Sequence, residues 1–140
     1  MRAPLLLGLA LAAPCAAQSP ALVPQITGEA LVKLMGNVDP ATVSWSPASP
    51  FRTRAIAAEY LDMSNGEFVR GFIQGVHDAT EGKAWCPSAQ VRPLPHEMAA
   101  DARSALQRLP AAQLKRSAAE LITETWRATW PCPTGARRTG

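Results

Sequence analysis

His77 and Asp78 are adjacent in the sequence, and a histidine beside a carboxylate is a pair that many enzymes use to move a proton. The surrounding residues repeat with a helical period, however, and on a helix only residues three or four positions apart share a face. We therefore expect the two side chains to point away from each other and not to act as a catalytic dyad. A catalytic role would require an activity that is lost when His77 or Asp78 is changed.

Other residues that carry chemistry do not form a recognisable site. Zinc needs three or four convergent ligands, whereas the two histidines, His77 and His96, lack a His-x-x-x-His spacing and the chain has no Cys-x-x-Cys. The serines lack the context of a nucleophile elbow. Gly71 and Gly75 lie inside an apolar helical pattern and not in a phosphate-binding loop. We expect no catalysis, no cofactor and no metal.

Residues 1–17 have the features of a secretory signal peptide. A short basic start precedes the apolar run of residues 5–13, which is too short to span a membrane. Small residues allow cleavage near Ala17, and this predicts export to the periplasm. A lipoprotein acylated at Cys15 is the less favoured alternative, because Pro14 fits that processing poorly.

Removal of the signal peptide leaves two cysteines, Cys86 and Cys132, which can then pair only with each other. A disulfide is the expected state of such a pair in an oxidising compartment. Closing the loop between them would stabilise the fold by about 4 kcal/mol in the chain-entropy model.

The distribution of charge argues against a nucleic-acid partner. The chain has 14 Lys and Arg against 11 Asp and Glu, for a formal net charge of +3, and its arginines are scattered. Proteins that bind nucleic acid concentrate their basic residues in a patch or stripe. No second apolar segment has the length of a membrane span, so we also expect no transmembrane helix in the mature chain.

Apolar residues recur at helical spacing along most of the chain, and no segment shows the alternation of a strand. We expect an all-α fold: a small bundle of about four to five helices with one disulfide, forming a single domain over residues 18–132 with a flexible tail at 133–140. The expected helices cover residues 28–35, 53–63, 64–81, 95–109 and 110–130. The short joint at Pro110 predicts that the last two helices form an antiparallel hairpin.

One helix boundary rests on a capping pattern. Ser64 and Glu67 have the spacing of a capping box, in which each side chain satisfies a free backbone N–H at a helix start. We therefore favour a break before Ser64 over one long helix from residue 53. Gly82 offers a helix stop.

Two glycines inside the 64–81 helix need compensation. Gly71 and Gly75 each cost about 1 kcal/mol relative to Ala in a helix interior. We expect them to form a helix-packing site with Phe72, where a neighbouring helix approaches closely.

The tryptophans and the loop at residues 83–94 are candidates for a binding surface. Trp126 lies on an apolar stripe and is expected in the core, whereas Trp45, Trp85 and Trp130 lie in or near loops and can be either interface anchors or local packing residues. Cys86 fixes the base of the 83–94 loop. We therefore expect its partner contacts to be Trp85, Gln90 and Arg92.

Several short motifs together resemble those of the Rap/Tai immunity family. They are Thr27-Gly28-Glu29-Ala30-Leu31, Gly71-Phe72-Ile73-Gln74-Gly75-Val76-His77-Asp78-Ala79, Trp85-Cys86-Pro87, Leu109-Pro110 and Pro131-Cys132. The family consists of small exported helical proteins, and characterised members block peptidoglycan amidases that are delivered by type VI secretion. Family members commonly carry a further cysteine pair, but this chain has Met35 and Phe68-Val69 in those regions.

The resemblance implies a periplasmic protein that binds a secreted cell-wall amidase and occludes its active site, and it implies a possible homodimer. The alternative is a general cell-envelope protein with a structural or assembly role, which shares the fold but has no toxin partner. A deletion strain with envelope defects in the absence of any toxin would favour that alternative.

Overall fold

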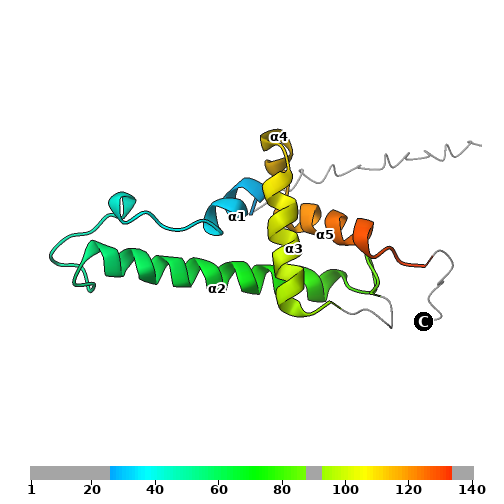
Figure 1. Ribbon diagram of the computed structural model, residues 1–140, viewed down its shortest axis with the longest axis horizontal. Helices are drawn as coiled ribbons and strands as arrows, with labels where there is room; N and C mark the ends of the chain where they lie inside the picture. The colour runs from blue at the N-terminus through cyan, green and yellow to red at the C-terminus, as the bar shows by residue number, and fades with distance from the viewer. Residues whose placement is uncertain (1–25, 88–92, 134–140) are drawn as a thin grey trace, which may run out of the picture.

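The computed structural model describes residues 26–87 and 93–133, and it is mostly helical (Figure 1). Its helices are α1 (Gly28–Leu34), α2 (Arg54–Thr80), α3 (Pro95–Arg108), α4 (Ala111–Leu114) and α5 (Ala118–Thr129), with a 3-10 turn, η1 (Pro40–Thr42). No strand forms in the described ranges, where only two isolated bridges occur. The all-α prediction is confirmed, and so is the disulfide between Cys86 and Cys132.

Helix α2 is continuous, so the predicted break before Ser64 is wrong. The helix begins after Thr53, whose side-chain oxygen accepts the N–H of Ile56 at 3.2 Å, and it continues through the capping-box residues to Thr80. The segment before α2 contacts this part of the helix, since Asp62 Oδ1 accepts the backbone N–H of Val38 at 2.6 Å. An intact helix keeps its backbone hydrogen bonds across this region, and a break would give them up for two capping bonds.

The main hydrophobic core lies where α1, α3 and α5 pack on the C-terminal half of α2 (Figure 1). Its largest fully buried side chains are Leu31, Trp85, Leu106, Ile122 and Trp126. They come from α1, from the turn after α2, from α3 and from α5, so residues distant in sequence close one core. The predicted core position of Trp126 is confirmed.

A close backbone approach occurs at Gly28 in α1 and not at the glycines of α2. A Cβ built on Gly28 would lie 2.8 Å from Leu121 Cδ1 and 3.0 Å from Leu114 Cδ2. Cβ atoms built on Gly71 and Gly75 would meet nothing within 4 Å. The expected packing of a neighbouring helix on these two glycines is therefore wrong within the chain, because both lie on the face of α2 that is exposed to solvent.

Phe72, the third residue of the expected packing site, is half-buried. It packs against the main core, and its ring stacks on Phe68 with ring centroids 6.3 Å apart. Phe68 itself is exposed. Phe72 therefore contributes to the core at its edge and does not join the two glycines in a helix–helix contact.

The N-terminal half of α2 extends beyond the main core together with residues 36–53 (Figure 1). A second small cluster of Val43, Ala57 and Ala58 holds this extension together. Trp45 packs on the cluster, and its indole N–H donates to the backbone oxygen of Phe51 at 2.8 Å. Of the two alternatives left open by the sequence, local packing describes Trp45.

The last two expected helices are divided differently from the prediction. The chain after Pro110 forms the short α4 and then a turn before α5, because residues 116–118 pair with the segment that precedes α1. The N–H of Gly28 donates to the oxygen of Arg116, and the N–H of Ala118 donates to the oxygen of Ile26, both at 3.0 Å. Figure 1 shows α3 crossing α2 and α5 steeply, so the expected antiparallel hairpin is wrong. Among the described helices, none has both the length and the hydropathy to cross a membrane.

Candidate interaction site at the disulfide-anchored loop

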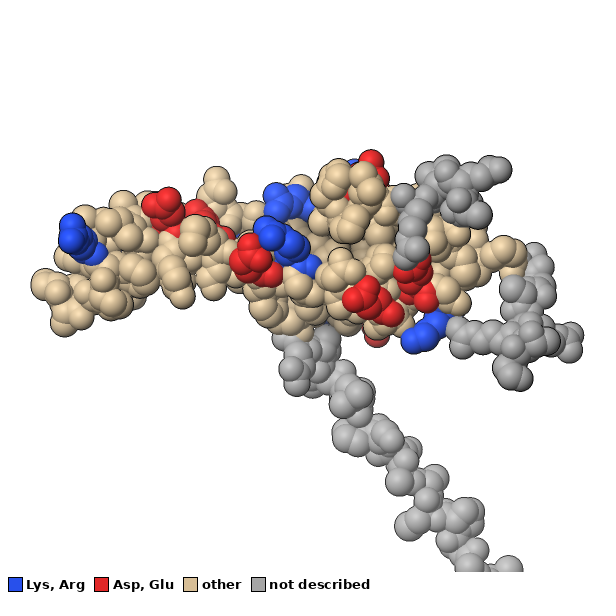
Figure 2. Space-filling model, turned by 90° about the horizontal axis from the view of Figure 1, so that it is seen from below, with Lys and Arg blue, Asp and Glu red and all other residues tan. Residues whose placement is uncertain are grey.

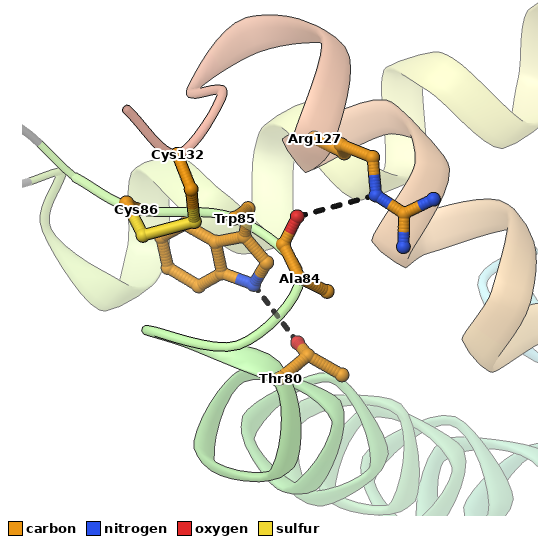
Figure 3. The surroundings of a disulfide bond; sticks show 6 residues. All are labelled: Thr80, Ala84, Trp85, Cys86, Arg127 and Cys132. Atoms are coloured by element: carbon orange, nitrogen blue, oxygen red, sulfur yellow. Dashed lines mark hydrogen bonds between the residues drawn. A yellow bond between two sulfur atoms is a disulfide. The ribbon is translucent and has the colours of Figure 1, made fainter. Parts of the chain in front are cut away.

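A disulfide fixes the point where the chain leaves the main core after α2. Cys86 and Cys132 are 46 positions apart in the sequence and are joined Sγ to Sγ (Figure 3). The backbone N–H of Cys86 also donates to the oxygen of Trp130 at 2.9 Å. The covalent bond and the hydrogen bond together tie the start of the loop to the end of α5.

Gly82 ends α2, as its position in the sequence predicted. Its φ of 71° is the only positive φ among the described residues, in the region that glycine adopts without strain. The N–H of Gly82 donates to the oxygen of Trp85 at 2.8 Å, which closes a tight turn. The turn reverses the chain and directs residue 85 back toward the core.

Trp85 is therefore a core residue, and the prediction that it contacts a partner is wrong. Only 1% of its surface is exposed. Its indole N–H donates to Thr80 Oγ1 at 2.8 Å (Figure 3), and its ring packs on Trp126 with centroids 5.3 Å apart. The ring of Trp130, which is half-buried, also packs on Trp85, with centroids 5.8 Å apart. Local packing describes Trp130 as well.

Two residues that the sequence analysis did not single out hold the turn in place. Thr80 accepts the indole N–H of Trp85 and donates its own hydroxyl hydrogen to the oxygen of Val76 at 2.6 Å. Arg127 Nε on α5 donates to the oxygen of Ala84 at 3.2 Å (Figure 3). Neither residue belongs to a local sequence motif, because the partner of each is brought close only when the turn folds.

His77 and Asp78 do meet, contrary to the prediction that adjacent helical residues point apart. His77 Nδ1 lies 2.9 Å from Asp78 Oδ1, because this ring nitrogen is close enough to the backbone to reach the next carboxylate. The hydrogen bond from His77 lowers the pKa of Asp78, and a second from Gln74 Nε2, at 2.8 Å, adds to the effect.

The other ring nitrogen of His77 is also engaged, since Nε2 lies 3.4 Å from Glu81 Oε2. The ring packs edge-on against Trp85 and Trp126, with centroid distances of 5.3 and 6.3 Å. A general base needs a ring nitrogen that can reach a substrate proton. With both nitrogens beside carboxylates and the ring against the core, His77 is placed to hold the end of α2.

Gln90 and Arg92 lie outside the described residues. Among those described, no three His, Cys, Asp or Glu side chains come together as metal ligands would. His96 is exposed on the first turn of α3. This helix is capped at its start by Glu97, whose Oε2 accepts the backbone N–H of Leu94 at 2.7 Å. The structure therefore describes the two ends of the candidate loop and places neither of its two remaining candidate contacts.

The model of a family described as Rap1a immunity proteins matches residues 28–132, from the first residue of α1 to the second cysteine of the disulfide. No curated protein matches the chain.

Proposed function

Because the chain belongs to the family of Rap1a immunity proteins, we propose that it protects the producing cell by inhibiting a peptidoglycan amidase that is delivered by type VI secretion. The observation that carries the proposal is the extent of the match, which covers every described helix and both cysteines of the disulfide. Membership of an immunity family implies a non-catalytic protein that acts on a protein partner. The arrangement of His77 agrees with that reading, because both its ring nitrogens already lie beside carboxylates.

The proposed site of action is the periplasm, after cleavage of the signal peptide near Ala17. Two features support this location. The sequence begins with a secretory pattern, and the fold contains a disulfide of the kind that persists in oxidising compartments.

We place the partner contact on the loop between Cys86 and Pro95, with Gln90 and Arg92 as its contact residues. The loop starts at a residue fixed by the disulfide and ends at the first residue of α3. Fixed ends reduce the conformational entropy that a loop loses when it binds. The proposed inhibition is steric, with this loop occupying the active-site cleft of the amidase.

The test combines binding with protection. The mature protein is mixed with a peptidoglycan amidase that is delivered by type VI secretion, and peptidoglycan hydrolysis and the dissociation constant are measured. Inhibition together with survival of the producing strain in a competition assay supports the proposal. No binding and no protection would contradict it and would favour the envelope-protein alternative.

The loop placement has its own test in charge-reversal variants. Arg92→Glu should weaken amidase binding at least about tenfold, as expected when a charged contact is reversed, and leave the melting temperature unchanged. Arg108→Glu at the end of α3 is the matched control. Equal affinities of Arg92→Glu and wild type would place the contact elsewhere.

We also propose that two copies pair through the exposed face of α2. Large apolar side chains lie exposed in its N-terminal half, at Ile56, Tyr60 and Met63, and its C-terminal half has the open positions Gly71 and Gly75. These halves are complementary in size when two helices lie antiparallel. Such a pairing about the helix midpoint sets Tyr60 of one copy opposite Gly75 of the other.

Two charged residues lie near the midpoint of α2. Glu67 and Arg70 pair there within one chain at 3.1 Å, so their charges are already matched within each copy. Sedimentation should show a dimer for the mature protein and a monomer for Tyr60→Lys, with Gln107→Lys as the control. A wild-type protein that stays monomeric when its concentration is raised about 100-fold from the micromolar range would contradict the pairing.

A further inference from the structure

A basic groove lies where α3 crosses α2, and no motif of the sequence indicated it. Two adjoining hollows of about 350 and 410 Å³ share Arg70, Ile73, His96 and Ala99. Gly66, Val69, Ala100 and Arg103 complete the lining of the first. We call this surface the α2–α3 groove. Both helices are rigid elements, so the groove is formed by the fold itself and not by a loop.

The floor and the rim of the α2–α3 groove differ in chemistry. Val69 and Ile73 of the floor are 5% and 4% exposed and belong to the main core. The side chains of Arg70, His96 and Arg103 are exposed at the rim. None of the described residues that line either hollow is acidic. An apolar floor beneath a rim that carries two arginines and a histidine is a surface that favours an anionic group with an apolar neighbour.

The two arginines are available to an incoming anion. Arg103 has no ion-pair partner in the described part of the chain, although Asp62 lines an adjoining hollow beside it. Arg70 pairs with Glu67 at 3.1 Å, but both side chains are largely exposed, at 72% and 68%. Exposed pairs of this kind contribute little stability, so Arg70 can exchange its partner. Figure 2 shows basic side chains gathered near the middle of the face seen from below, with acidic ones beside them.

We propose that the α2–α3 groove is an interaction surface for an acidic segment of a partner protein, in which an Asp or Glu side chain is followed or preceded by an aliphatic one. The carboxylate binds Arg103 and Arg70, since the guanidinium fork matches a carboxylate in two parallel hydrogen bonds. The aliphatic side chain covers Ile73 and Ala99. This inference rests on the proposed function for the identity of the partner, which is the inhibited amidase.

The first test uses a small acidic dipeptide, and the amidase itself is tested afterwards. The mature protein labelled with ¹⁵N is titrated with N-acetyl-leucyl-aspartate amide and, in parallel, with the neutral isostere N-acetyl-leucyl-asparagine amide. The acidic probe should shift the backbone amides of Ile73, Ala99 and Arg103 in a saturable way, and the neutral probe should bind at least about fivefold more weakly, as loss of a charge-assisted bond implies.

Two variants locate the binding. Arg103→Gln should weaken the acidic probe about tenfold, because it removes the charge and the fork but keeps an aliphatic stem. Arg108→Gln, with the same change of net charge at the end of α3, should leave the affinity unchanged. Equal binding of the two probes, no saturable shift, or tighter binding of inorganic phosphate than of the acidic probe would overturn the proposal.

Inhibition of the amidase separates this proposal from the proposed function. An Arg103→Gln protein that binds the amidase less well than wild type supports the groove as part of the interface. If wild type and Arg103→Gln inhibit the amidase equally, the immunity function stands and the groove proposal fails. If the acidic probe binds as expected but no amidase is inhibited, the proposed function fails while the chemistry of the groove holds.

Discussion

The hydrogen bond between Trp85 and Thr80 is the contact that brings the chain after α2 back into the core. The indole N–H is buried and donates to Thr80 Oγ1 at 2.8 Å. A buried donor without its acceptor costs about 1–3 kcal/mol. We therefore expect Thr80→Val, which keeps the shape of the side chain, to lower the free energy of unfolding by that amount.

Trp85→Phe removes the donor and provides the matching variant. The double variant should be less destabilised than the sum of the two single changes, because both remove the same bond. Urea denaturation of the four proteins gives the coupling energy. If the losses in the free energy of unfolding of the two single variants add up to that of the double variant, the hydrogen bond does not determine the position of Trp85.

The glycines make a second prediction at the scale of single residues. Gly28→Ala should destabilise the fold by about 1–3 kcal/mol, because the added Cβ would lie 2.8 Å from Leu121 Cδ1 in a packed core. Gly75→Ala should stabilise it by about 0.5–1 kcal/mol, since the position is helical and nothing lies near the added atom. Guanidinium denaturation at a protein concentration where the chain is monomeric measures both. A Gly28→Ala protein that is as stable as the wild type, or more stable, would contradict the packing described at Gly28.

At the scale of elements, α2 is one continuous helix to which the preceding segment is attached. The local pattern at Ser64 and Glu67 favours a new helix start, but the segment before α2 lies along it and donates the N–H of Val38 to Asp62. This contact spans 24 positions in the sequence. A capping pattern reports only a local preference, so it could not show that the backbone hydrogen bonds of one uninterrupted helix would prevail at Ser64.

Asp62→Ala should release the extension from α2 while leaving the main core intact. The second cluster has only three buried residues, Val43, Ala57 and Ala58, so it has little apolar area with which to hold residues 36–53 in place. Hydrogen exchange should become faster over residues 38–53 and stay unchanged in α5. Asp62→Asn, which keeps an acceptor oxygen, is the control and should lie between wild type and Asp62→Ala. Unchanged exchange at Val38 in the alanine variant would show that the hydrogen bond does not hold the extension.

At the scale of the whole molecule, the helical class, the disulfide and the stop at Gly82 could be predicted from the sequence because each depends on local pattern or on the number of cysteines. The burial of Trp85, the crossing of α3 over α2 and the resulting groove could not. They depend on the direction in which the chain leaves a turn, and neither hydrophobic period nor residue spacing specifies that direction. The same limit explains why Arg103, which has no motif around it, was not among the candidate residues.

The disulfide links the whole fold to the proposed function, and this gives the last prediction. Replacing Cys86 and Cys132 together with alanine should lower the free energy of unfolding by about 2–4 kcal/mol, because the unfolded chain regains the freedom of a loop spanning 46 positions. The helical circular dichroism should persist, since Trp85 still packs on Trp126. Amidase binding should weaken, because the loop loses the covalent anchor at its start.

Reduction of the wild-type protein provides the control for this pair of substitutions. Wild type with dithiothreitol should unfold at the same guanidinium concentration as the double alanine variant, and oxidised wild type at a higher one. If the reduced protein kept both its stability and its affinity for the amidase, the hydrogen bond from Cys86 to Trp130 and the packing of Trp85 would be sufficient to hold the loop. A loss of affinity larger than the loss of stability would instead show that the disulfide orders the loop for binding.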